Sequence, residues 1–207
     1  MLYIEPVSRI VLIVVFSLFS IIRALYYRKA RSAGYATVIE ERKRYSIWLS
    51  VFICYEVFTF FLYIWFPQSL AWAAVPLPAW SRILGIILGV SALSWFVWIH
   101  RSLGTNHSTR LRIKDGQVLV TDGPYSRIRH PMYSAFYLLH IAVFFLTANW
   151  IIGVTWLAGL TVTVVLRVKR EEEMLLHRFG AEYGSYMKRT GRFVPPLKPI
   201  RPGGRQV

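Results

Sequence analysis

Long apolar stretches, separated by polar or basic segments, follow one another along most of the chain. The hydrocarbon core of a bilayer is roughly 30 Å thick, so a helix needs about 20 mostly apolar residues to cross it. Residues 7–27, 47–66 and 83–99 approach or meet that length. A fourth region, residues 132–166, is too long for one helix and is interrupted at residues 147–149. It predicts a tight C-terminal helical hairpin with a short first arm, and we expect an all-α polytopic membrane protein with about five transmembrane helices.

Composition agrees with this pattern. Hydrophobic residues make up 55% of the chain and charged residues 17%, against roughly 25% charge in an ordinary soluble domain. A chain with this much apolar surface is not intrinsically disordered. The single cysteine, Cys54, excludes a disulfide scaffold. The net charge is +15. In an apolar chain such a charge points to anionic lipid head groups rather than to nucleic acid.

The distribution of Lys and Arg predicts how the helices are oriented. Segments 28–44, 100–129 and 167–207 are basic, whereas residues 67–81 contain no Lys or Arg. Because short cytoplasmic loops are enriched in these residues, we expect a multi-pass protein with the N-terminus outside and the C-terminus in the cytoplasm. A cleaved signal peptide is disfavoured because no basic region precedes residues 7–27.

Some residues within the predicted spans have a specific interpretation. Arg9 and Arg23 lie near the ends of the first span, where they are expected to reach the head groups. Glu56 lies in the middle of the second span; such a carboxylate is a candidate functional group, but a hydrogen bond to a neighbouring helix is the simpler interpretation. Gly85 and Gly89 have the four-residue spacing that lets another helix approach closely.

Two polar stretches, residues 101–131 and 167–207, are predicted to share the cytoplasmic face. Pro131 lies just inside the start of the fourth predicted span, so Arg129 and His130 mark a helix entrance at the membrane surface. They are candidates for an anion site or for anchors at lipid phosphates. The glutamates at 171–173 are candidates for the same site or for an ordinary solvated charge run.

Common soluble-enzyme motifs are missing from the sequence. It contains no GxGxxG after a strand, no P-loop and no GxSxG elbow. The five histidines lack a metal-ligand spacing with cysteines or acids, so we expect no metal. The residues alone indicate a polytopic membrane protein with a cytoplasmic polar site.

The segment LVTDGPYSRIRHPMY, followed after the hairpin by REEEMLLHRFGAEYGSYMKRTGRFVP, resembles the isoprenylcysteine carboxyl methyltransferase family, which is related to membrane phospholipid methyltransferases. The resemblance covers roughly residues 103–195. It divides the chain into N-terminal transmembrane helices (1–99), a methyltransferase core (100–195) and a basic, Pro/Gly-rich tail (196–207). It implies a membrane enzyme that uses S-adenosylmethionine in a cytoplasmic pocket built without a Rossmann fold.

Site residues follow from the same resemblance. Those expected to bind the cofactor are Gln117, Val118, Leu119, Val120, Tyr125, His130, Pro131, Met132, Tyr133 and Glu171. Those expected to be catalytic are Arg129, Arg167 and Glu172, with Arg167 at the substrate carboxylate. The segment LGTNHS resembles a family turn, with His107 where an aromatic residue is often found.

Three functions remain open at this point. The first is methylation of the carboxylate of a prenylated cysteine or similar lipophilic acid that enters from the bilayer. The second is N-methylation of a phospholipid amine, and the third is a non-enzymatic membrane protein. A carboxylate acceptor is already ionised near neutral pH and needs a cation to orient it, whereas an amine must first lose a proton. Arg129 and Arg167 therefore favour the carboxylate.

Overall fold

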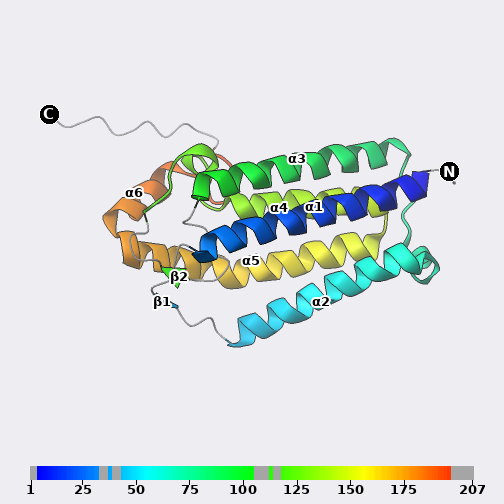
Figure 1. Cartoon of the computed structure of the whole chain (residues 1–207), viewed down its shortest axis with the longest axis horizontal. Coiled ribbons are helices and arrows are strands. Elements are labelled where there is room, and N and C mark those ends of the chain that lie inside the picture. Colours follow the sequence, from blue (N-terminus) through cyan, green and yellow to red (C-terminus); the bar gives the residue numbers. More distant parts are fainter. Residues whose placement is uncertain (1–3, 33–36, 39–42, 105–111, 114–117, 197–207) are drawn as a thin grey trace.

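The computed structural model describes residues 4–32, 37–38, 43–104, 112–113 and 118–196. Long helices run side by side along one axis (Figure 1): α1 (Ile4–Ser32), α2 (Lys43–Trp65), α3 (Trp80–Leu103), α4 (Pro131–Thr147) and α5 (Trp150–Phe179). Shorter elements connect or extend them: η1 (Pro67–Ala73), η3 (Gly123–Ser126), α6 (Ala181–Arg189), and the strands β1 (Thr37–Val38) and β2 (Arg112–Ile113), which pair antiparallel.

Among the described residues, the helices that are long and apolar enough to cross a membrane are α1, α2, α3 and α5. Helix α4 is apolar but has 17 residues, which confirms the prediction of a short first arm. Many large apolar side chains lie on the outside of the bundle, among them Ile10, Val57 and Ile87. In water such a surface would be strongly unfavourable, whereas in a bilayer it contacts lipid. The chain is an all-α integral membrane protein, as its hydropathy predicts.

The hairpin between α4 and α5 turns at the interruption seen in the sequence. Ala148 adopts a left-handed conformation with φ of 40° and ends α4. The side chain of Asn149 then caps α5 by accepting a hydrogen bond from the N–H of Ile152 at 3.2 Å. Its amide nitrogen donates to the carbonyl of Leu70 at 2.9 Å, so the same residue also ties η1 to the turn. Thus one polar side chain fixes three segments at this end of the bundle.

Helix α3 packs directly against α4 at Gly85. A Cβ atom added there would lie 3.0 Å from Cγ of Leu146, 3.0 Å from its backbone nitrogen and 3.1 Å from the carbonyl oxygen of Ala142. At Gly89, by contrast, the nearest atom would be 3.6 Å away, on the flexible side chain of Val15. The small-residue spacing therefore does allow the close helix approach that it predicts, mainly through its first glycine.

Substitution Gly85→Ala should destabilise the protein by about 1–3 kcal/mol, because the added methyl group meets backbone atoms of α4 that cannot move independently. Gly89→Ala is the matched control and should change the stability little. Thermal unfolding of both variants in the same detergent measures the difference. Equal melting temperatures for the two variants would contradict this description of the α3–α4 contact.

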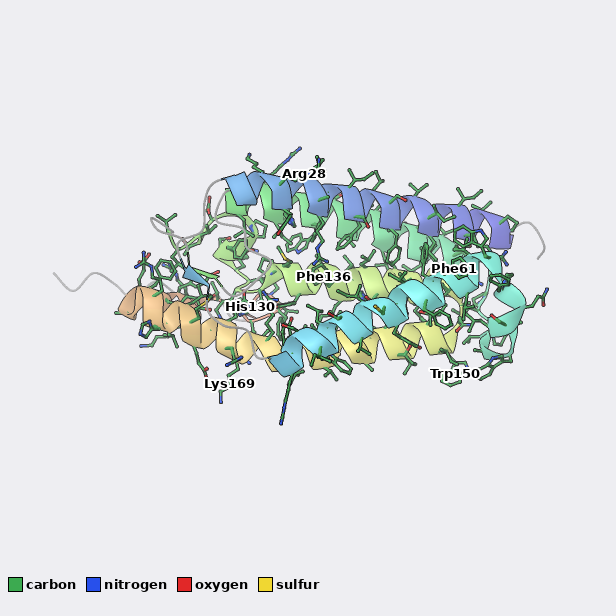
Figure 2. All side chains as sticks on the ribbon, turned by 60° about the horizontal axis from the view of Figure 1, so that its bottom comes forward. Arg28, Phe61, His130, Phe136, Trp150 and Lys169 are labelled. Carbon is green, nitrogen blue, oxygen red and sulfur yellow. The ribbon has the colours of Figure 1, made fainter. Side chains whose placement is uncertain are left out.

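The polar ends of the helices meet at the end of the bundle opposite Trp150, as the positions of His130 and Trp150 show (Figure 2). Helix α5 extends beyond its apolar part to Phe179, and Gly180, with φ of 53°, ends it. After α6 the chain runs beside the residues that precede α4. The N–H of Arg129 donates to the carbonyl of Gly191 at 2.8 Å, and the N–H of His130 donates to that of Arg192 at 3.0 Å.

Candidate active site

A cavity of about 310 Å³ is lined by residues from α1 to α6, from η3 and from the segment before η3. Its lining between the membrane-spanning helices is largely aromatic or aliphatic with some polar side chains, and it is more polar near α6. Most of the predicted site residues line it: Val118, Leu119, Val120, Tyr125, Arg129, His130, Met132, Tyr133, Arg167 and Glu171. The fold thus gathers three separate sequence segments around one space.

Other predicted residues have different positions. Pro131 is buried at the first position of α4 and is not part of the cavity lining. Glu172 is also buried and lies outside the lining. Gln117, His107 and most of the predicted C-terminal tail fall outside the described residues.

Two arginines and a histidine surround the carboxylate of Glu172. Its Oε1 atom accepts hydrogen bonds from Nε of Arg129 at 3.2 Å and from Nε of Arg192 at 3.2 Å, and it lies 3.3 Å from Nε2 of His130. Its Oε2 atom accepts a bond from Nη2 of Arg192. Glu172 is only 5% exposed. Its contacts join α5 to the start of α4 and to the segment after α6. Hydrogen bonds to Glu172 raise the pKa of Arg192.

Arg129 is also bonded to the backbone that follows α6. Its Nη1 atom donates to the carbonyls of Met187, at 2.9 Å, and Thr190. With Nε bound to Glu172, the guanidinium has little freedom to rotate. The side chain therefore combines a structural role with its position on the cavity wall.

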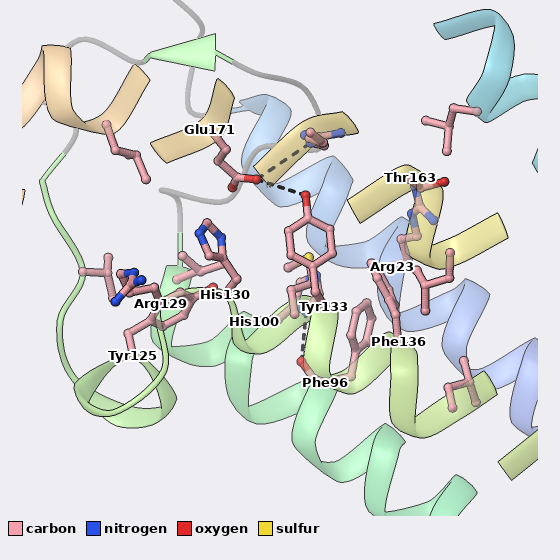
Figure 3. Close-up of a pocket in the computed structure, with 18 of the residues that line it drawn as sticks. Arg23, Phe96, His100, Tyr125, Arg129, His130, Tyr133, Phe136, Thr163 and Glu171 are labelled. Carbon is pink, nitrogen blue, oxygen red and sulfur yellow. Dashed lines mark hydrogen bonds and ion pairs between the residues drawn. The ribbon is translucent and has the colours of Figure 1, made fainter. Parts of the chain in front are cut away.

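Glu171 faces the cavity, one residue before Glu172. The hydroxyl of Tyr133 donates to Oε2 of Glu171 at 3.0 Å, and Nε of Arg167 lies 3.9 Å from the same oxygen (Figure 3). Nη1 of Arg167 donates to the hydroxyl of Tyr45 at 3.2 Å, and the guanidinium lies 5.7 Å from the centre of the Tyr45 ring. The contacts of Arg167 with Tyr45 and Glu171 hold it between α2 and the polar end of α5.

Three tyrosines form the wall near α6. The hydroxyl of Tyr186 donates to the carbonyl of Tyr125 at 2.6 Å. Tyr183 is 1% exposed, and its buried hydroxyl has no hydrogen-bond partner among the described residues. Burial raises the pKa of Tyr125 and of Tyr183, with nearby glutamates acting in the same direction. Both phenols therefore stay protonated at neutral pH and can donate hydrogen bonds. Tyr183 and Tyr186 were not predicted as site residues, although the FGAEYGSY segment contains both.

The membrane part of the cavity contains further polar side chains. Oε1 of Glu56 lies 2.9 Å from Nε2 of His140, which confirms that Glu56 is hydrogen-bonded to a neighbouring helix. Arg23 of α1 and Tyr45 of α2 line the same space. The sequence marked Glu56 and Arg23 as charges within spans, but it gave no sign that they share a cavity with the predicted site.

This architecture is that of a helical membrane protein with a cavity that is more polar near α6 and mostly apolar within the bundle. Residues 83–177 match the model of the isoprenylcysteine carboxyl methyltransferase (ICMT) family, which confirms the resemblance read from the sequence. Helices α1 and α2 lie outside this match.

Individual relatives agree with the family match. The chain is 29% identical to the human protein-S-isoprenylcysteine O-methyltransferase over 138 residues, which are 65% of this chain and 48% of that protein. It is 32% identical to the Schizosaccharomyces pombe protein of the same name over 84 residues, which are 41% of this chain and 35% of that one. It is 24% identical to methanethiol S-methyltransferase 2 of Bradyrhizobium diazoefficiens over 140 residues, 61% of this chain and 53% of that protein. The chain thus spans about half the length of the human relative.

The fold is also similar to a solved structure, described as the eukaryotic intramembrane Ras methyltransferase ICMT without a monobody. The TM-score is 0.53 at 22% identity, covering 76% of this chain and 54% of that one. At this identity the likeness concerns the fold.

Proposed function

We propose that this protein is a membrane methyltransferase that transfers a methyl group from S-adenosylmethionine to the carboxylate of a prenylated cysteine or a similar lipophilic acid. The observation that carries the proposal is the cavity itself. Its polar end contains Glu171 and Arg167, and its other end extends between apolar helices. Relatives named protein-S-isoprenylcysteine O-methyltransferase support the assignment of reaction class and acceptor.

The residues near α6 are suited to S-adenosylmethionine. The buried hydroxyl of Tyr183 has no hydrogen-bond partner among the described residues, and Glu171 presents a carboxylate on the cavity wall, so both can bind the hydroxyl or amino groups of an adenosyl ligand. Val118, Leu119 and Tyr125 offer apolar and aromatic surface. Bound there, the cofactor would supply a methyl group on a sulfonium, which an ionised oxygen accepts without any proton transfer.

Arg167 is proposed to orient the acceptor. A carboxylate is ionised near neutral pH and needs no general base. It does need to be held in one orientation, because positioning supplies much of the rate in such displacements. A guanidinium holds a carboxylate through two parallel hydrogen bonds, and the contacts of Arg167 with Tyr45 and Glu171 limit its movement. We propose that Arg129 faces the same space, and that Glu172 positions it.

Other acceptors are distinguished by their charge. A phospholipid amine is a cation near neutral pH, and a site next to Arg167 and Arg129 disfavours it. A thiol is the acceptor in the name of one relative, and a thiolate shares the negative charge of a carboxylate. Purified protein should be assayed for methyl transfer to N-acetyl-S-farnesylcysteine, phosphatidylethanolamine and methanethiol. Transfer to the acid supports the proposal, and exclusive transfer to either of the others would refute it.

The proposed orientation places the active site on the cytoplasmic side. The cavity's polar end lies at the end of the bundle that bears α6, whereas Trp65, Trp72, Trp80 and Trp150 are exposed on elements at the opposite end. Exposed tryptophans are typical of a membrane interface. We propose a cytoplasmic C-terminus in a prokaryotic inner membrane, with residues 100–195 as the methyltransferase core and residues 1–99 completing the acceptor side.

Substitution Glu171→Gln should weaken S-adenosylhomocysteine binding about 10-fold or more. A hydrogen bond to a charged group contributes roughly 1.5–3 kcal/mol, and the amide removes that charge while preserving the shape. Calorimetric titration measures the affinity. Glu173→Gln is the control, because Glu173 is exposed and lies outside the cavity lining. Unchanged affinity in folded Glu171→Gln would contradict a role of this carboxylate in cofactor binding.

A further inference from the structure

Helix α1 contributes a positive charge to the cavity. Arg23 lies within the candidate span Pro6–Lys29, about 9 Å from its Lys29 end at 1.5 Å per residue. Its side chain is among those that line the cavity (Figure 3). From the sequence we expected this side chain to extend toward the lipid head groups. Its position on the cavity wall requires a different explanation.

Within the part of the chain that the structure describes, no hydrogen bond or ion pair within 4.0 Å holds the Arg23 guanidinium. Arg82, another arginine within a span, does have a protein partner: its Nη1 atom donates to the carbonyl of Phe145 at 2.7 Å. A guanidinium at membrane depth is costly unless it is paired or reaches water. An arginine that faces a cavity without a protein partner is therefore a candidate for binding an anionic ligand.

Two charged groups act on Arg23, but among the described residues neither forms an ion pair with it. The charges of Arg167 and Glu56 both act on it. Arg167 has the same sign, and Glu56 is already hydrogen-bonded to His140 at 2.9 Å. Two guanidinium groups that face one space repel each other, and an anion bound between them would relieve that repulsion. The arrangement therefore favours a ligand with a negative charge at this point.

The charges of the cavity lining also favour an anionic ligand. Among the described lining residues there are three arginines and two glutamates, and the proposed cofactor carries a further net positive charge. The cavity lining also contains aromatic side chains, among them Phe16 and Phe19 of α1 and Phe52 of α2. A ligand that suits both features has an anionic head group and an apolar tail.

We infer that Arg23 and Arg167 bind the acceptor carboxylate together, one from α1 and the other from α5. This inference rests on the proposed function and adds to it a second residue that positions the acceptor. A carboxylate has about four acceptor sites, so it can receive hydrogen bonds from both guanidinium groups. Contacts from two helices fix the rotation of the carboxylate, which one arginine alone does not. Arg23 lies outside residues 83–177, so the clamp joins the family-matched region to an N-terminal helix.

The test compares an acid with its uncharged counterpart. Protein in detergent, saturated with S-adenosylhomocysteine, is titrated calorimetrically with N-acetyl-S-farnesylcysteine and with the corresponding carboxamide. In Arg23→Gln we expect the affinity for the acid to fall about 10-fold or more, while the affinities for the carboxamide and for S-adenosylhomocysteine stay unchanged. Arg23→Lys, which keeps the charge, should recover part of the loss.

Arg28→Gln is the matched control. Arg28 lies on the same helix and points away from the bundle (Figure 2), so this variant should bind the acid like the wild type. Equal loss of acid and carboxamide affinity in Arg23→Gln would show a merely structural role and overturn the inference. So would an unchanged preference for the acid, or a wild-type protein that does not distinguish acid from carboxamide. A wild-type protein that prefers the acid but never methylates it would instead refute the proposed function.

Discussion

Replacement of Arg167 by lysine is expected to lower kcat/KM for the lipophilic acid about 100-fold. Lysine keeps the positive charge and reaches the interface, but it cannot form two parallel hydrogen bonds with a carboxylate. It also loses the contact that Nη1 of Arg167 makes with the Tyr45 hydroxyl at 3.2 Å. A charged hydrogen bond is worth roughly 1.5–3 kcal/mol, and about 2.7 kcal/mol corresponds to a 100-fold change in rate. Steady-state methylation assays measure the effect.

Arg178→Lys is the control for this experiment. Arg178 is exposed on the same helix and does not line the cavity, so the same chemical change should leave turnover at the wild-type level. S-adenosylhomocysteine binding by Arg167→Lys should also remain close to wild type. Near-normal methylation by Arg167→Lys would show that Arg167 is only an interfacial anchor. It would also remove a main reason for preferring a carboxylate acceptor over an amine.

The second large effect is expected on stability. Glu172→Gln should lower the free energy of unfolding by about 3 kcal/mol. The substitution removes the negative charge from a site where Arg129 and His130 are buried beside it, and breaking a buried ion pair by removing one partner typically costs about 3–5 kcal/mol. Arg192 is half exposed, so water compensates it in part. Denaturant titration in a mild detergent measures the difference.

The adjacent residue provides a sharp control. Glu173 lies 4.0 Å from Lys169 in an i,i+4 pair whose side chains are 62% and 86% exposed. Such surface pairs contribute little, so Glu173→Gln should leave the stability nearly unchanged. If Glu172→Gln were as stable as Glu173→Gln, Glu172 would not be the group that joins α4, α5 and the segment after α6.

These experiments separate two neighbouring carboxylates that sequence patterns treat alike. Consecutive residues of a helix point about 100° apart, so two neighbouring carboxylates can have different surroundings. The structure places Glu171 on the cavity wall and Glu172 among cations of other segments. The chemical role proposed for Glu171 and the positioning role proposed for Glu172 follow from that difference.

The sequence by itself determined which apolar segments form the long helices. Apolar runs of membrane-spanning length identify the spans because the bilayer sets the length of a helix. Pro131 and Gly180 mark a helix start and a helix end through their own backbone geometry. Most of the residues that the family resemblance named line the cavity, because the motif segments lie in contiguous stretches that fold as units.

Only the tertiary structure decided which side chains from distant helices share that cavity. Arg23 and Glu56 were visible in the sequence as charges within spans, yet the hydropathy of a span is the same whichever way the helix is rotated about its axis. Rotation is set by packing against neighbouring helices, and here it turns Arg23 toward the cavity and brings Glu56 within 2.9 Å of His140, 84 residues away. No local pattern records a contact between residues so far apart, because its free energy depends on the packing of the whole bundle.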